Sequence, residues 1–139
     1  EKDTGTTACT PVGVFVGVSY TDPNTNQKTF SQTYPASTSA SDISAYVVDD
    51  PFVEMKMQSD QSIAQTGLGN NAAVVQTAGS TSIGRSKNAV DGSTIATTNT
   101  LPVKIIEFVE GPDSAVGDSF TDVIVVFNAG HQLTNTTGV

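Results

Sequence analysis

The sequence predicts an all-β fold: a small single-domain β-sandwich or β-barrel with long Ser/Thr-rich loops and at most one short helix. Residues 101–110 and 120–128 are rich in β-branched residues, alternate in side and are bounded by turn formers. Residues 12–20 show the cleanest alternation in the chain. Charged residues make up only 14% of the chain, a composition that suits a β-rich surface better than helices with salt-bridged faces.

The chain begins with a polar, Thr-rich stretch over residues 1–11, which we expect to form an N-terminal arm. Residues 1–5 have the character of a mid-chain loop, so we also expect a further segment ahead of them. The first strand is expected to place five residues on one face: Val12, Val14, Val16, Val18 and Tyr20.

A hairpin and two short strands are expected next. Residues 21–26 have turn chemistry, and residues 29–34 can return as the paired strand. Residues 43–48 form a short strand ended by the Asp-Asp-Pro sequence that follows. Residues 52–58 alternate apolar and polar side chains, which predicts a strand with one wet face.

The middle of the chain carries the one helical signal. Residues 59–66 could form a helix of barely two turns, capped by Ser59 or Asp60 and closed by Gly67. Residues 72–76 predict another short strand. Residues 77–100 are too long for a plain loop, so we expect short strands there or a lobe that orders against a partner.

The two C-terminal segments predict paired strands inside a sandwich or barrel, because both faces of each are largely apolar. On the first strand we place Leu101, Val103, Ile105 and Val109 on one face, and Lys104, Ile106, Phe108 and Glu110 on the other. On the second, Val123, Val125 and Phe127 share a face. We expect the chain to fray after Phe127, with a β domain over 12–132 and a tail over 133–139.

Charge excludes several function classes. The chain carries 14 acidic and 6 basic residues, a net charge of −8. Such a chain repels phosphate, which disfavours nucleic acid and anionic membrane surfaces as partners. No apolar run is long enough to span a bilayer. The single cysteine, Cys9, excludes an intramolecular disulfide.

No residue pattern predicts catalysis. A nucleophilic pair of Cys9 with His131, the only histidine, is conceivable, but a surface or packing role suits both residues better. The sequence has no Gly-x-Ser-x-Gly elbow, and the Gly-Leu-Gly stretch at 67–69 lacks the rest of a dinucleotide fingerprint. We therefore expect a protein that is not an enzyme.

Cofactor and metal sites are not expected either. The carboxylates at 49–50 and at 113, 118 and 122 lack the spacing of an EF-hand loop, and turn chemistry explains them better than a structural cation. A paired-carboxylate glycosidase site is disfavoured because the chain has no Trp and only three Tyr to line a cleft.

Four stretches of this chain resemble structural proteins of tailed bacteriophages. They are Val12-Gly13-Val14-Phe15-Val16-Gly17-Val18-Ser19-Tyr20-Thr21-Asp22, Phe30-Ser31-Gln32-Thr33-Tyr34-Pro35, Ala45-Tyr46-Val47-Val48-Asp49-Asp50-Pro51-Phe52 and Gly111-Pro112-Asp113-Ser114-Ala115-Val116-Gly117-Asp118. The sequence is most similar to capsid decoration (cement) proteins of phages that infect marine bacteria, including cyanobacteria. The similarity spans roughly residues 12–132 and lies in strand-and-turn signatures.

The resemblance implies an all-β protein on the outer capsid surface of the virion, present in the host cytoplasm during assembly. There it bridges neighbouring major-capsid subunits, resists internal DNA pressure and associates as a homotrimer. It brings no catalytic residues. The alternatives are another virion module (tail, fibre or head-fibre part), a cell-surface adhesion domain, and a Cys–His hydrolase.

We expect partner contacts on the two segments without a buried periodicity, residues 1–11 and 79–99, because recognition falls on segments that the core leaves free. For Arg85 and Lys87 a solvated loop and a contact with an acidic patch are equally plausible readings. The candidate interface residues are Thr4, Thr6, Thr7, Cys9, Arg85, Lys87 and Asn88.

Overall fold

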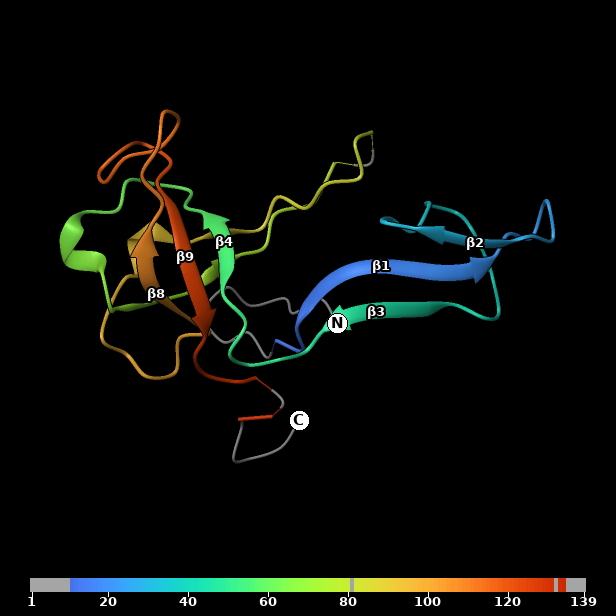
Figure 1. Cartoon of the computed structure of the whole chain (residues 1–139), viewed down its shortest axis with the longest axis horizontal. Coiled ribbons are helices and arrows are strands. Elements are labelled where there is room, and N and C mark those ends of the chain that lie inside the picture. The colour runs from blue at the N-terminus through green and yellow to red at the C-terminus, as the bar shows by residue number, and fades with distance from the viewer. Residues whose placement is uncertain (1–10, 81, 132, 135–139) are drawn as a thin grey trace.

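A computed structural model describes residues 11–80, 82–131 and 133–134. These residues form nine short strands and two 3₁₀ turns, arranged as a body from which one sheet projects (Figure 1). The expected all-β fold is confirmed. Among the described residues, no helix has the length and apolar character needed to cross a membrane.

The projecting sheet contains three antiparallel strands in the order β2-β1-β3. They are β1 (Val14–Thr21), β2 (Lys28–Ser31) and β3 (Ser44–Val48). The expected hairpin joins β1 to β2, with Thr21 opposite Lys28 beside the turn. The expected strand at 43–48 is β3, which lies on the other side of β1.

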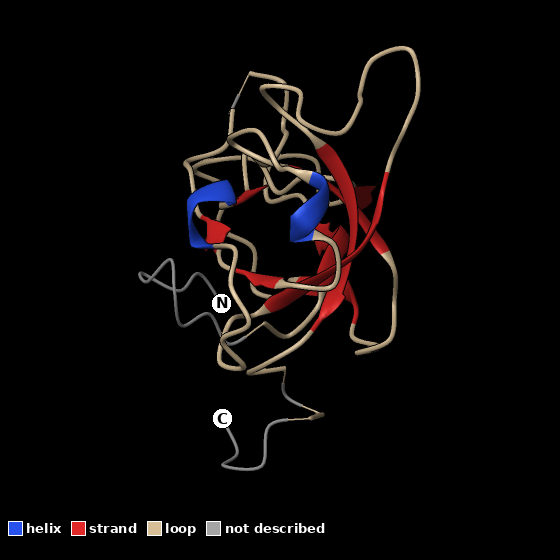
Figure 2. Cartoon of the chain, turned by 90° about the vertical axis from the view of Figure 1, so that its left-hand side faces the viewer, coloured by secondary structure: helices blue, strands red, loops and turns tan. Residues whose placement is uncertain are grey.

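The body contains a four-stranded antiparallel sheet in the order β4-β9-β8-β5 and a two-stranded sheet of β6 and β7. The 3₁₀ turn η1 lies at the end of the body opposite the projecting sheet (Figure 1), and Figure 2 views the molecule from that end. The elements of the body are β4 (Met55–Gln58), η1 (Gln65–Gly67), β5 (Asn71–Ala72), β6 (Val74–Val75), β7 (Ala89–Val90), η2 (Gly92–Thr94), β8 (Val103–Phe108) and β9 (Asp122–Phe127).

The main hydrophobic core lies in the body. Its buried members come from β5, β7, β8, β9 and the loop before η1, and the two methionines of β4 pack against them. Burying a side chain of this kind stabilises the fold by about 1.5–3 kcal/mol. The buried residues of this cluster are Ile63, Ala72, Val90, Val103, Ile105, Val123 and Val125.

A β-bulge in β8 corrects one predicted face. Ile105 lies opposite Val125, but the next pair of the ladder is Glu107 with Ile124, so Ile106 is the additional residue. An extra residue in one strand reverses the alternation beyond it. Phe108, predicted on the face away from Ile105, therefore lies opposite Val123 and packs against the core.

A second bulge divides β1. Phe15 lies opposite Val47 and Gly17 opposite Tyr46, which leaves Val16 without a partner across the ladder. The prediction that the valines of this strand share one face is therefore wrong. Val14 and Val18 lie on opposite sides of the projecting sheet, because residues paired across an antiparallel ladder point to the same side.

The helix expected over residues 59–66 is absent, and the only helical geometry near this stretch is that of η1, which begins at Gln65. Both predicted capping residues bind elsewhere. Ser59 is buried and its hydroxyl donates to the Val90 carbonyl at 3.1 Å. The Asp60 carboxylate accepts from the Gly92 N–H at 3.0 Å. These contacts hold residues 59–60 against β7 and η2.

The chain does not fray after Phe127. The N–H groups of Asn128 and Ala129 donate to the carbonyls of Pro102 and Leu101 at 2.8 and 3.3 Å. His131 is completely buried, and its ring lies 4.9 Å from that of Phe127. The prediction of fraying overlooked the residues before β8, which bind this end of the domain.

Residues 76–80 and 82–88 form a second projection, which we call the hairpin. Ser80 and Arg85 are bridged near its tip, and the hairpin extends in the same direction as the projecting sheet (Figure 1). Its tip meets the loop after β2, because a Cβ built on Gly84 would lie 2.5 Å from the Thr33 methyl group. Gly84 also has φ +61°, so both space and backbone conformation favour glycine there.

Candidate interaction surface

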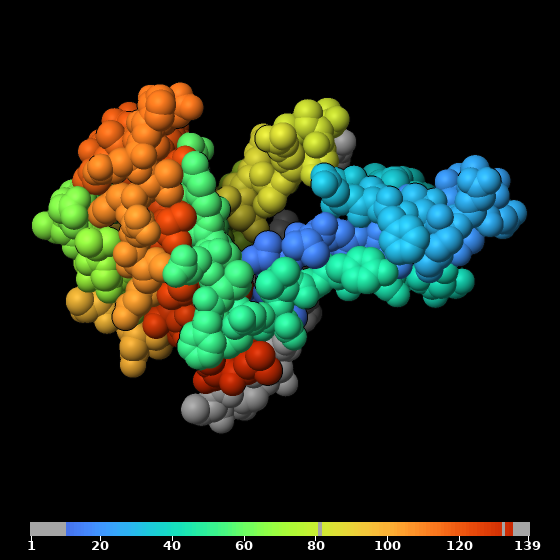
Figure 3. All heavy atoms as spheres, in the orientation of Figure 1, coloured from blue at the N-terminus to red at the C-terminus, as the bar shows by residue number. Residues whose placement is uncertain are grey.

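Exposed hydrophobic side chains concentrate on the projecting sheet. Nine of the fifteen large hydrophobic residues that are exposed in the described part of the chain lie between residues 12 and 48. Exposed apolar surface of this kind is a candidate site of interaction. Figure 3 shows the sheet standing clear of the body, and the nine residues are Val12, Val14, Phe15, Val16, Phe30, Ile43, Tyr46, Val47 and Val48.

The outer end of the projecting sheet has a small core of its own. Val18 and Tyr20 are buried there, and the Tyr34 ring meets Tyr20 edge-on at 5.1 Å. The Tyr34 hydroxyl donates to the Thr38 carbonyl at 2.7 Å, which fixes the loop after β2 over this side of the sheet. The strands that carry the exposed residues are therefore held together at their outer end by packed side chains.

Two rings define a shallow apolar depression on the other side of the sheet. Phe30 and Tyr46 flank Gly17, and the depression is also lined by Val18, Ser31 and Gln32. The Tyr46 hydroxyl donates to the Ser19 hydroxyl at 3.1 Å, which holds the ring across β1. Phe30 is 71% exposed and has a ring free to enter a partner.

Charge is nearly absent from this surface. Between residues 12 and 48 the chain carries only Asp22, Lys28 and Asp42. Lys28 and Asp42 form a salt bridge of 2.9 Å near the outer end. Hydrogen bonds from the Thr21 N–H, from Lys28 and from the Thr21 hydroxyl hold the pKa of Asp42 below its ordinary value.

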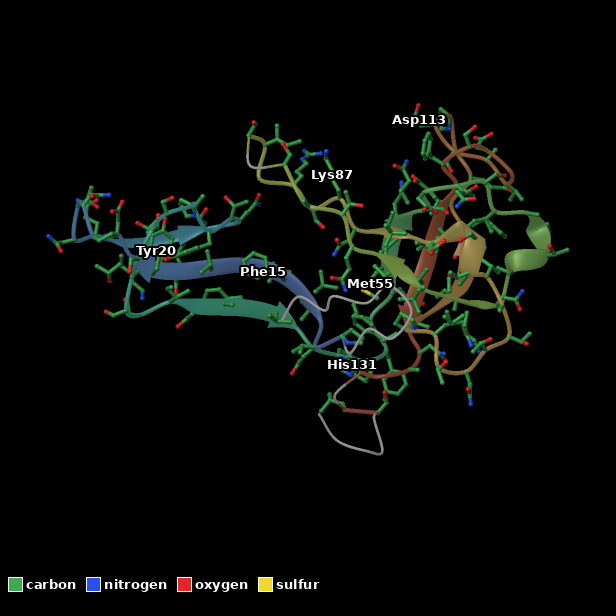
Figure 4. The ribbon with its side chains drawn as sticks, turned by 180° about the vertical axis from the view of Figure 1, so that it is seen from behind. Phe15, Tyr20, Met55, Lys87, Asp113 and His131 are labelled. Carbon is green, nitrogen blue, oxygen red and sulfur yellow. The ribbon has the colours of Figure 1, made fainter. Side chains whose placement is uncertain are left out.

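The predicted contact residues that the structure describes lie on the hairpin. Arg85, Lys87 and Asn88 are all exposed, and Lys87 points outward from the hairpin in Figure 4. The other four predicted residues, Thr4, Thr6, Thr7 and Cys9, lie outside the described residues.

The candidate catalytic histidine has no access to solvent. His131 accepts at Nδ1 from the Leu133 N–H at 3.3 Å, and its Nε2 has no hydrogen-bond partner among the described residues. Its proposed partner Cys9 is outside them. This environment is that of a core side chain.

Two of the carboxylates considered as a cation site are engaged locally. Asp118 accepts from the Ala115 N–H at 2.8 Å, and Asp122 pairs with Lys56 at 2.7 Å. In the part of the chain that the structure describes, no three His, Cys, Asp or Glu side chains are placed to hold a metal ion.

Comparison with known proteins found no matching family model, no matching curated protein and no matching solved structure.

The sequence predictions did not name the projecting sheet as a candidate contact surface. They placed the strands at 12–20 and 43–48 in the fold and placed contacts in the loops. One signal was available: glycines at 13 and 17 alternate with the valines of the first strand. Small residues on one strand face leave little side chain to bury against a body.

Proposed function

We propose that this protein is a virion structural protein that decorates the outer surface of a phage capsid and cements neighbouring major-capsid subunits. The observation that carries this proposal is the concentration of nine exposed hydrophobic residues between positions 12 and 48, seven of them in the strands of the projecting sheet. Three strands with apolar residues on both sides gain free energy from a partner that removes these residues from water.

Two further features support an assembly role. The similarity to cement proteins includes β1 and β3, the strands that bear most of the exposed residues. The net charge of −8 suits a position on the outer face of the capsid, away from the DNA. We further propose that the protein associates as a homotrimer and docks on the major capsid protein.

Composition and structure of the particle test the proposal. Mass spectrometry and cryo-electron microscopy of virions of the phage that encodes this chain should find many copies on the outer capsid surface. A few copies confined to the tail would favour the alternative of a tail or fibre module. Absence from the particle would overturn both.

A binding assay tests the surface itself. Replacing Phe30 with Ser should weaken binding to capsids that lack the protein by about tenfold or more, since a ring that enters a partner contributes on the order of 1.5–3 kcal/mol. Phe120→Ser is the matched control, because Phe120 is also exposed (59%) but lies on the body. Equal binding by both variants would show that the projecting sheet is not the contact.

A further inference from the structure

The edges of the two larger sheets differ in how they are covered. In the body, Ala96 covers the edge of β5 by pairing with Asn71 of that strand. The N–H group of each residue donates to the carbonyl of the other, at 2.9 and 3.0 Å. On the opposite edge, Ser59 at the end of β4 is bridged to Val90 of β7. By contrast, β3 pairs with β1 alone, and no described residue pairs with its outer edge.

The β3 strand also lacks the features that protect exposed edges. Native edge strands are blunted by charged residues, proline or a bulge. The β3 sequence Ser-Ala-Tyr-Val-Val contains no charge and no proline, and the bulge of this ladder lies in β1. All five of its residues are exposed. The other edge strand of the sheet, β2, carries Lys28.

Acidic residues mark the two ends of β3. Asp42 precedes the strand and is paired with Lys28. Asp49 and Asp50 follow Val48 directly, and within the described residues neither has a salt bridge. The end of β3 nearest the body therefore combines an apolar edge with two carboxylates that have no paired cation.

This charge pattern disfavours a second copy of the chain at the same edge. Antiparallel pairing of two β3 strands brings Asp49 and Asp50 of one copy toward Asp42 of the other, whose cation Lys28 is already engaged, so these carboxylates gain no free cation. Parallel pairing brings the same carboxylates side by side. Like charges across a ladder destabilise it.

We propose that the free edge of β3 takes up an extended segment of a partner protein, with β-branched residues along β3 and Lys or Arg beside Asp49 and Asp50. Backbone hydrogen bonds to the edge supply affinity, and the basic residues select the segment and its direction. This inference rests on the proposed docking role of the projecting sheet and specifies the chemistry of the segment that docks.

Peptide binding to the full chain tests it without a capsid. The probe is a short blocked peptide with two lysines followed by alternating valine and threonine, and its twin has two glutamates in place of the lysines. In antiparallel pairing, its N-terminal lysines lie beside Asp49 and Asp50. The lysine peptide should slow amide hydrogen exchange in Tyr46–Val48 and bind about tenfold more tightly than the twin.

A double variant isolates the charge contribution. The variant with Asp49→Asn and Asp50→Asn should bind both peptides alike, because it lacks the two charges that distinguish lysine from glutamate. Asparagine keeps the shape of the side chain and can accept the hydrogen bond that Asp50 accepts from the Phe52 N–H at 2.8 Å. Glu110→Gln with Asp113→Asn removes two charges on the body, with Asp113 far from β3 in Figure 4, and should keep the preference for lysine.

Three results overturn the inference: no change in β3 exchange with the lysine peptide, equal affinity of the wild-type chain for both peptides, or β3 protection that rises with protein concentration alone. The last result identifies a second copy as the occupant. The capsid experiments are independent: a chain that binds the peptide but is absent from virions refutes only the proposed function.

Discussion

The Asp42 carboxylate accepts two hydrogen bonds from Thr21, one from its N–H and one from its hydroxyl, both at 2.8 Å. The two residues are 21 positions apart. Their contact fixes the end of the loop after β2 to the last residue of β1, on the side of β1 to which β3 is added. The position of β3, and with it the exposed apolar surface, depends on this pair.

Loss of the Asp42 charge should loosen the projecting sheet in acid. The Thr21 N–H is the largest cause of the lowered pKa, followed by the Lys28 side chain. Because the folded pKa lies below the ordinary value of 3.8, the carboxylate stabilises the fold above that pH. The stabilisation is lost as pH falls from about 4 toward the folded pKa.

The Asp42→Asn variant provides the measurement. At pH 7 it should show faster hydrogen exchange than wild type at Thr21 and in β3. Thermal unfolding followed by circular dichroism should show a difference between the two proteins that shrinks below about pH 4. Glu54→Gln is the control, because Glu54 is an exposed acid with no hydrogen bond or salt bridge to another described residue. A difference that is independent of pH would contradict the assigned role.

The β8 bulge predicts unequal losses of stability for substitutions at two neighbouring isoleucines. Ile105 is fully buried in the core, whereas Ile106 is 36% exposed at the bulge. Ile105→Ala should lower the free energy of unfolding by about 3 kcal/mol, since it leaves a cavity in a packed core. Ile106→Ala should cost less than about 1 kcal/mol. Urea denaturation of both variants measures the difference, and equal costs would place the bulge elsewhere.

The two bulges show where prediction from sequence reached its limit. The strands at 103–108 and 122–127 lie within the predicted ranges, because β-branched composition and flanking turn residues are local signals. A bulge adds one residue without changing composition, and the face of every later residue then changes. Phe108 and Val14 were misplaced for this reason.

The candidate surface was harder to predict than the strands. The alternating valines of β1 indicate a strand that buries one face. They do not show whether that face is covered by another part of this chain or by a different molecule. Here the partner strands come from within residues 28–48, so that sheet stands apart from the core. The spatial separation of a sheet from the body depends on long-range contacts that a local pattern does not encode.

His131 should behave as a packing residue. His131→Ala should cost about 2–3 kcal/mol because it empties a fully buried site against Phe127. His131→Leu should recover most of this loss, since Nε2 makes no hydrogen bond among the described residues and an apolar atom suits its place. Chemical denaturation of the two variants gives the comparison. Equal losses would show that the imidazole nitrogens contribute stability.

The hairpin gives the last prediction, which separates the two candidate contact surfaces. Replacing Arg85 and Lys87 with Glu reverses two exposed charges while leaving the core untouched. Each exposed ion pair contributes on the order of 1 kcal/mol or less. If the hairpin contacts an acidic patch of the capsid, the double variant should occupy capsids about tenfold less well at low salt.

Salt dependence distinguishes this loss from that of Phe30→Ser. The screening length for interactions between exposed charges is about 8 Å at physiological ionic strength and shortens as salt is added. The effect of the double variant should therefore shrink with added salt. The effect of Phe30→Ser should persist, since removal of an apolar ring from water does not depend on charge. Lys104→Glu, on the exposed side of β8, controls for the added negative charge. Normal occupancy by the double variant would leave the projecting sheet as the contact surface and assign Arg85 and Lys87 to a solvated loop.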